Sequence, residues 1–136
     1  MNATQASILI VDDDPNHIKF LSAWLRAAGY VPLVAVDGLQ AVTIARRQRP
    51  DLVLLDIGLP GGGGYSVLRR IKEMPALSDI PVVVLSALDA EENRQKSLQG
   101  GAEGYLQKPA DLNALIVMIQ NILAKRTPHP HPSSSS

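Results

Sequence analysis

Four short runs of apolar residues alternate with longer segments in which apolar residues recur every three or four positions. The runs are nearly continuous rather than strictly alternating, which is typical of parallel strands covered on both faces. A weaker fifth run, GYLQ, follows near the end of the pattern. The sequence therefore predicts five strands, at residues 8–11, 31–36, 52–55, 80–85 and 104–107.

The segments between these runs have helical periodicity. In the first segment, Asp14 is a suitable N-cap, Pro15 suits the first helical position and Gly29 ends the pattern. We expect four more helices, after Asp37 and at roughly residues 65–74, 91–99 and 111–124. Strands and helices thus alternate five times, and right-handed crossovers then give a doubly wound α/β fold with a five-stranded parallel sheet.

The length and composition suit a single folded domain. The chain has 136 residues, 46% of them hydrophobic, which is enough for one core but not for two. We expect this domain to cover residues 7–126. Residues 1–6 before it and the Pro/Ser-rich residues 127–136 after it are expected to be disordered.

Charge and cysteine content narrow the function classes. Basic and acidic residues number 13 each, so no net field draws the protein to nucleic acid or to an anionic membrane. The chain has no cysteine, which excludes disulfides and thiolate metal sites. No signal-peptide pattern is visible, and no apolar run approaches the roughly 20 residues that span a bilayer. These features favour a cytoplasmic protein that recognises its partners locally.

Chemically useful side chains follow four of the five expected strands. Asp12 and Asp13 follow the first, Asp56 the third, Ser86 the fourth and Lys108 the fifth. Ligands of open parallel sheets bind beyond the carboxyl ends of the strands, so a strand order of 2-1-3-4-5 brings the three carboxylates together. Such carboxylates repel one another unless a cation joins them, and Mg²⁺ prefers oxygen ligands. The pattern predicts a magnesium site beside a phosphoryl-accepting aspartate, Asp56, with Lys108 and Ser86 contacting phosphoryl oxygens.

Each of these residues also has a simpler structural interpretation. An aspartate at a strand end often serves only as a turn or cap residue, and a single lysine usually lies on the surface. Their joint occurrence at four strand ends favours the functional interpretation. His17 stands apart from this set and is interpreted as an ordinary exposed helix residue.

The four glycines at 61–64 raise the alternative of a loop that cradles a nucleotide phosphate. A loop of the GxxxxGK[ST] type needs lysine after its last glycine, but Tyr65 occupies that position. The GxGxxG spacing is also absent. The glycines are therefore interpreted as part of the surroundings of Asp56.

Four stretches together resemble the receiver domain of response regulators in two-component signalling. They are ILIVDDDP at 8–15, PDLVLLDIGLPGGGGYSVL at 50–68, IPVVVLSA at 80–87 and GAEGYLQKP at 101–109. The resemblance implies a flavodoxin-like three-layer sandwich in which Asp12 and Asp13 organise Mg²⁺. It also implies that Asp56 accepts a phosphoryl group from a kinase histidine and that Lys108 binds this group.

The same resemblance implies further roles near the site. Asp56 and the backbone carbonyl of Gly58 would also be metal ligands. Ser86 and Tyr105 would form a switch that carries the signal to the face made by the fourth helix, fifth strand and fifth helix. The bond before Pro109 would be cis. For Tyr105, the sequence alone favours a half-buried ring with its hydroxyl in water.

Two features depart from the pattern of many relatives. Glycines at 62–64 replace Met-Asp-Gly, so the aspartate that would cap the third helix is missing and the loop should be looser. Gly58 places no side chain over the phosphoryl group, which should let water approach, whereas the apolar Leu88 should partly offset this opening.

The favoured function is a phosphorylation-switched signalling domain, not an enzyme beyond its own phosphorylation and dephosphorylation. Its expected phosphodonor is a sensor histidine kinase or a histidine phosphotransfer protein. The alternative is a receiver-like interaction module that works without phosphorylation. An aspartate-nucleophile phosphatase is disfavoured because Gly58 stands where a second acid is needed. The signal is expected to pass to a downstream protein or to a phosphorylation-dependent homodimer, through a binding face that includes Val117 and Met118. Direct binding to nucleic acid or to a membrane is not expected.

Overall fold

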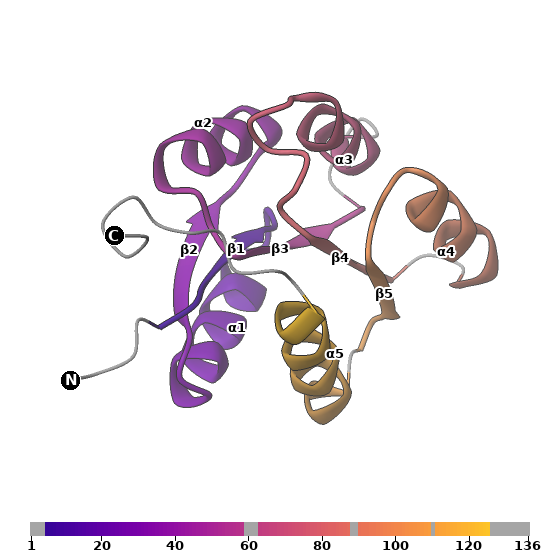
Figure 1. The fold of residues 1–136 in the computed structure, drawn as a ribbon. Helices are drawn as coiled ribbons and strands as arrows, with labels where there is room; N and C mark the ends of the chain where they lie inside the picture. The colour runs from indigo at the N-terminus through magenta and orange to yellow at the C-terminus, as the bar shows by residue number, and fades with distance from the viewer. Residues whose placement is uncertain (1–4, 59–62, 88–89, 110, 126–136) are drawn as a thin grey trace.

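The computed structural model describes residues 5–58, 63–87, 90–109 and 111–125 (Figure 1). The predicted disordered tail at 127–136, most of the predicted disordered segment at 1–6, Gly62 and Leu88 lie outside these ranges. The strands are β1 (Ser7–Val11), β2 (Val31–Ala35), β3 (Leu52–Asp56), β4 (Val82–Ser86) and β5 (Gly104–Gln107). The helices are α1 (Pro15–Ala27), α2 (Gly38–Gln48), α3 (Gly63–Glu73), α4 (Ala90–Gln99) and α5 (Leu112–Lys125).

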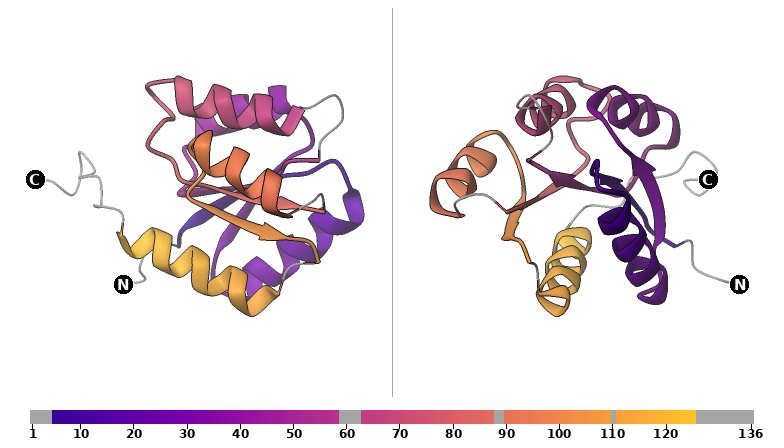
Figure 2. Two further views of the ribbon diagram at one scale, coloured as in Figure 1. Left: turned by 90° about the vertical axis from the view of Figure 1, so that its right-hand side faces the viewer. Right: turned by 180° about the vertical axis from the view of Figure 1, so that it is seen from behind.

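The five strands form one parallel sheet in the order β2-β1-β3-β4-β5, which confirms the predicted topology. Helices α1 and α5 lie side by side on one face of the sheet, α2 and α3 cover the other face, and α4 lies beside β5 (Figures 1 and 2). The sheet grows from β1 to β2 on one side and from β3 to β5 on the other, so the strand order reverses between β1 and β3. The carboxyl ends of these two neighbouring strands therefore open at the same edge.

The sheet separates two hydrophobic clusters. One lies between the sheet and α2 and α3 and includes Leu9, Val53, Val84 and Ile71. The other lies between the sheet and α1 and α5 and includes Ile10, Leu54, Leu21, Leu115 and Ile119. β1, β3, β4 and β5 each contribute alternate residues to the two clusters, which explains their continuous apolar sequences. The edge strand β2 contributes only to the cluster beneath α2 and α3, and its Val31 and Val34 are exposed.

The observed boundaries differ slightly from the predicted ones. β4 begins at Val82 rather than residue 80, because Pro81 has no N–H to donate, and it continues to Ser86, which pairs with Gln107. The predicted N-cap of α1 is confirmed, since the Asp14 side chain accepts a hydrogen bond from the backbone N–H of Asn16. Asp37 caps α2 in the same way, through the backbone N–H of Gln40.

The two residues predicted at an interaction face of α5 differ in environment. Val117 is 52% exposed. Met118 is partly buried and packs against the core, so its share in a partner face stays a prediction. A Cβ atom on Gly104 would lie 2.5 Å from the Met118 sulfur. The missing side chain at Gly104 therefore makes the space that Met118 fills.

Helix α4 is weakly anchored. Among its described side chains, only Ser97 is buried. Its polar contacts to α3 run through Tyr65, whose hydroxyl donates a hydrogen bond to Asn93 and whose ring centroid lies 4.7 Å from the Lys96 ammonium. Burial raises the pKa of the Tyr65 hydroxyl, which keeps it protonated as the donor in this contact.

In the part of the chain that the structure describes, no helix has the length and apolar character needed to cross a membrane.

Candidate functional site

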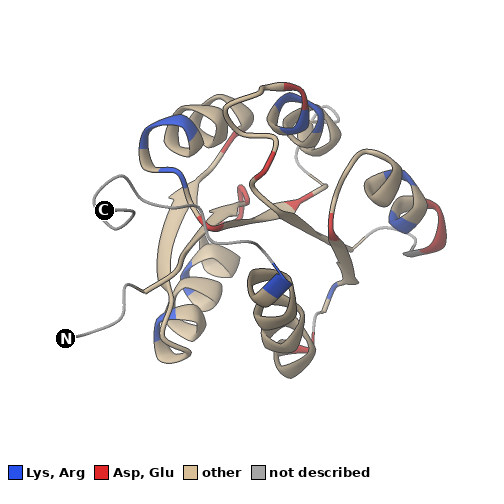
Figure 3. Cartoon of the chain, viewed as in Figure 1, with Lys and Arg blue, Asp and Glu red and all other residues tan. Residues whose placement is uncertain are grey.

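Three carboxylates meet at the carboxyl edge of the sheet. Each of Asp12, Asp13 and Asp56 has a potential ligand oxygen, and these oxygens all lie within 4.8 Å of one another. β1 and β3 are paired with Val11 opposite Leu55, so the next residues along the chain, Asp12 and Asp56, are neighbours. Figure 3 shows acidic positions at the strand ends, whereas most basic residues lie on the helices. The convergence expected from the strand order is present.

Lys108 joins this cluster from the end of β5. Its ammonium nitrogen Nζ lies 3.2 Å from Asp56 Oδ2 and 3.6 Å from Asp12 Oδ2. The backbone N–H of Lys108 donates to the Ser86 carbonyl at 2.7 Å, which fixes the start of the side chain beside β4. The Lys108–Pro109 bond is cis, as the resemblance implied. One ammonium thus contacts both the predicted acceptor and a predicted metal ligand.

Asp12 is the most deeply buried member of the cluster, with a side chain that is only 2% exposed. Burial acts to raise its pKa. The hydrogen bond from His17, the backbone N–H of Asp14 and the positive charge of Lys108 act in the opposite direction and together lower the pKa. Asp12 is therefore held as a carboxylate. These contacts also correct the interpretation of His17 as an ordinary exposed residue, because its Nδ1 contacts Asp12 Oδ2.

Asp56 is the last residue of β3 and is partly exposed, so its carboxylate can be reached by a phosphodonor. Its Oδ1 accepts a hydrogen bond of 2.9 Å from the backbone N–H of Gly58. A Cβ atom on Gly58 would lie 3.3 Å from the same oxygen. Gly58 therefore keeps the space beside the carboxylate open, as the sequence indicated.

Ser86 and Tyr105 lie on one face of the sheet. Tyr105 pairs with Val84, and both pack in the cluster beneath α2 and α3, while Ser86 is two residues beyond Val84 on the same face. Both residues are buried. Among the described residues the Tyr105 hydroxyl has no hydrogen-bond partner, so the interpretation that places it in water is wrong.

The donor set suits a hard divalent cation. All three converging groups are carboxylates, without a sulfur ligand, and Mg²⁺ is commonly held by one or two carboxylates together with water and phosphate oxygens. Asp13 is exposed, which leaves room for such additional ligands. Residues Asp12, Asp13 and Asp56 therefore fit the predicted metal.

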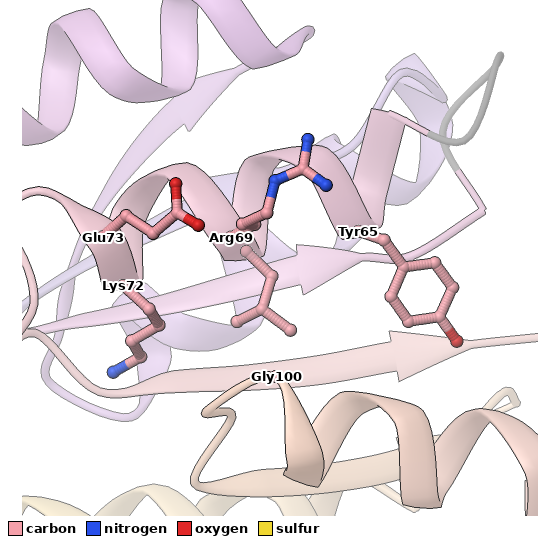
Figure 4. A pocket seen from close by; sticks show the side chains of 6 residues that line it. Tyr65, Arg69, Lys72, Glu73 and Gly100 are labelled. Carbon is pink, nitrogen blue, oxygen red and sulfur yellow. The ribbon is translucent and has the colours of Figure 1, made fainter.

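A separate open pocket of about 310 Å³ lies between α3 and the end of α4 (Figure 4). The Tyr65 ring borders it, Gly100 lies across from α3, and Lys72 points toward the α4 side. Lys72 is already engaged there, since its ammonium contacts Glu103 at 3.1 Å and the Ile80 carbonyl at 2.9 Å. None of the lining residues belongs to the acidic cluster, so this pocket is distinct from the site.

The sequence matches a known family model and characterised relatives. Residues 8–120 match the response regulator receiver domain. The chain is 38% identical to Protein PilH of Pseudomonas aeruginosa over 119 residues, which cover 88% of this chain and 98% of PilH. It is also 38% identical to Response regulator PleD of Caulobacter vibrioides over 117 residues, which cover 86% of this chain but only 26% of PleD. The chain thus spans about a quarter of PleD.

Solved structures with the same fold support the family match. A putative response regulator from Chloroflexus aurantiacus superimposes with a TM-score of 0.85 at 32% identity, covering 90% of this chain and all of that one. A second structure is the receiver domain of the sensor histidine kinase PA1611 from Pseudomonas aeruginosa, which was solved with magnesium in its active-site cleft. It superimposes with a TM-score of 0.81 at 34% identity, covering 90% of this chain and all of that one. The strand order, the acidic cluster with its lysine and these similarities lead to one conclusion: this chain belongs to the response regulator receiver domain family.

Proposed function

We propose that this receiver domain accepts a phosphoryl group on Asp56 in a Mg²⁺-dependent reaction and relays the signal by changing a protein-binding face. The observation that carries the proposal is the position of Lys108 Nζ, 3.2 Å from Asp56 and 3.6 Å from Asp12, beside three carboxylates that converge within 4.8 Å. This arrangement supplies an exposed nucleophile, a metal site and a cation for phosphoryl oxygens. The magnesium in the PA1611 receiver structure supports the same assignment.

The chemistry follows from these contacts. A carboxylate oxygen of Asp56 attacks phosphorus, the bond from phosphorus to the donor breaks, and the leaving group departs with the electron pair of that bond. The Lys108 ammonium moves from pairing with Asp56 to pairing with a phosphoryl oxygen. Asp12, Asp13, Asp56 and the Gly58 carbonyl would hold Mg²⁺, which neutralises the charge of the phosphoryl group when it is bound.

For the relay, we propose that Ser86 and Tyr105 respond to the phosphoryl group. Ser86 ends β4, and its backbone carbonyl holds the backbone N–H of Lys108. Tyr105 lies on the same sheet face, next to the weakly anchored α4. A shift of Ser86 toward the phosphoryl group would open space for the Tyr105 ring, and the surface of α4, β5 and α5 would change with it.

Hydrogen exchange with beryllofluoride, a stable mimic of a bound phosphoryl group, tests this proposal. With Mg²⁺ present, we expect beryllofluoride to alter amide exchange in α4 and β5 of the wild type but not of Asp56→Asn. Equal exchange with and without the mimic would contradict the relay. That result would favour the interaction module that works without phosphorylation.

The expected phosphodonor is a sensor histidine kinase or a histidine phosphotransfer protein in the cytoplasm, since the chain matches the response regulator receiver domain and its relative PleD is a response regulator. We further propose that the α5 surface at Val117, which is 52% exposed, contacts a downstream protein or a second phosphorylated copy of the chain. Sedimentation of the beryllofluoride-bound protein tests the homodimer. A dimer that is lost in Val117→Lys supports this face, and a dimer that persists in Val117→Lys contradicts it.

A further inference from the structure

His17 is brought to the acidic site by the turn that follows β1. Asp14 caps α1 and Pro15 starts it, so His17 lies in the first helical turn, above the end of β1. Its side chain is 24% exposed, whereas the side chain of Asp12 is 2% exposed. The His17 Nδ1 atom contacts Asp12 Oδ2 and thus covers this carboxylate on the side of α1.

The protonation of Asp12 defines which atom donates the hydrogen bond between His17 and Asp12. A carboxylate without a proton can only accept hydrogen bonds, so the Nδ1 atom carries the hydrogen and donates it to Oδ2. The other oxygen, Oδ1, accepts the backbone N–H of Asp14 at 3.0 Å. Both oxygens of Asp12 are therefore held, which fixes the plane of the carboxylate. A carboxylate has about four lone-pair positions, so Oδ1 keeps one for a metal, whereas Oδ2 also lies 3.6 Å from the Lys108 ammonium.

We propose that His17 is a positioning residue for the metal site: its Nδ1–H holds the Asp12 carboxylate in the orientation that binds Mg²⁺. This inference rests on the proposed magnesium-dependent function of the same site. Mg²⁺ demands near-ideal octahedral geometry, so a ligand that is already oriented costs less to reorganise. Hydrogen bonds that orient metal ligands typically affect metal affinity 10-fold to 100-fold.

The position of Lys108 supports this role. Its ammonium is closer to Asp56, at 3.2 Å, than to Asp12, at 3.6 Å. With His17 in place, Asp12 has a donor of its own and Lys108 remains beside Asp56. Without His17, the buried Asp12 carboxylate would attract Lys108 more strongly and turn toward it. The imidazole thus leaves Asp12 free to bind the metal while Lys108 stays beside Asp56.

A purely structural role for His17 is less consistent with the contacts. The first turn of α1 is already stabilised by the Asp14 cap and by Pro15. Alanine has a higher helix propensity than histidine, so His17→Ala should not weaken the helix. The contact with Asp12 therefore contributes to the site rather than to the start of the helix.

Titration of the ¹⁵N-labelled protein with MgCl₂, followed by amide NMR signals of residues 12–14 and 56–58, tests this inference without any phosphodonor. The key comparison is between His17→Ala and His17→Asn. Asparagine places its amide NH₂ at the same distance from the backbone as Nδ1 of histidine, so it can donate the same hydrogen bond, whereas alanine cannot. Lys19→Ala, an exposed change on the same helix, is the control for a substitution away from Asp12.

We expect His17→Ala to bind Mg²⁺ about tenfold more weakly than the wild type or worse, with His17→Asn within about threefold of the wild type. Lys19→Ala should not weaken binding. If the wild type binds Mg²⁺ and His17→Ala binds it equally or more tightly, the positioning role of His17 is overturned while the metal site stands. If the wild type shows no Mg²⁺ binding, both the metal site and the role of His17 are overturned. Weak binding in both His17 variants would also contradict the hydrogen-bond explanation.

Discussion

Lys108 and Asp56 form an ion pair across the carboxyl edge of the sheet, with 3.2 Å between Nζ and Oδ2. The ammonium is thus already placed where negative charge would accumulate in the proposed phosphoryl transfer to Asp56. Removing one such preorganised donor typically lowers a rate about 100-fold or more. We expect Lys108→Ala to accept phosphate from acetyl phosphate about 100-fold more slowly than the wild type.

The rate of phosphorylation is followed by intact-mass spectrometry at several times after mixing. Lys125→Ala, in the last turn of α5, removes a positive charge away from the site and should leave the rate unchanged. A Lys108→Ala protein that reacts at the wild-type rate would show that the ion pair is only structural.

We expect Gly58 to control the access of water to a phosphoryl group on Asp56. Because a Cβ atom at this position would lie 3.3 Å from Asp56 Oδ1, a longer side chain would extend over the phosphorylated carboxylate. We expect Gly58→Asn to lengthen the lifetime of the phosphorylated protein, measured as loss of the phosphoryl mass after the donor is removed. Gly58→Ala adds the Cβ atom without the amide and should have a smaller effect. Identical lifetimes in all three proteins would rule out this role.

Gly64 allows α3 to approach the end of β3. A Cβ atom on Gly64 would lie 2.4 Å from the Cα atom and 2.5 Å from the carbonyl oxygen of Ile57. Both of these are backbone atoms that cannot rotate away. We expect Gly64→Ala to lower the free energy of unfolding by about 1–3 kcal/mol, as measured by urea denaturation. The neighbouring Gly63→Ala reports the general effect of alanine in this turn, and equal stability of the two variants would refute the close approach.

The buried hydroxyl of Tyr105 is a cost to the unphosphorylated state. It has no hydrogen-bond partner among the described residues, and an unpaired buried polar group costs about 1–3 kcal/mol. Tyr105→Phe should therefore keep or increase the free energy of unfolding, by about 1 kcal/mol. Tyr30→Phe, at a partly buried tyrosine, is the matched control. A clear loss of stability in Tyr105→Phe alone would mean that the hydroxyl is satisfied in solution.

The sequence was sufficient to predict the fold because its apolar runs are short, continuous and separated by periodic segments. Such runs are typical of strands covered on both faces, and five runs with intervening helices lead to one parallel sheet, although the edge strand β2 is partly exposed. The start of β4 was predicted too early because Ile80 is as buried as the strand itself. Burial alone does not distinguish Ile80 from a strand residue, and Pro81 sets the boundary through its missing N–H.

The site could be predicted only in part. The convergence of Asp12, Asp56 and Lys108 follows from strand order, which a sequence pattern supports. The contact between His17 and Asp12 depends on how tightly the chain turns between β1 and α1, and a helical period carries no information about that turn. Its only signal in the sequence was the Asp14-Pro15 pair, which starts the helix immediately after the acidic residues. The space that Met118 fills likewise depends on another element, because it is left by Gly104 on β5.

The most direct test of the central claim is the intact mass of the protein after incubation with acetyl phosphate, with and without Mg²⁺, beside Asp56→Asn. Our account predicts a gain of one phosphoryl group that requires Mg²⁺ and is absent from the variant. A gain of the same size in Asp56→Asn, or no gain in the wild type under conditions where Mg²⁺ binds, would contradict the assignment of Asp56 as the phosphoryl acceptor.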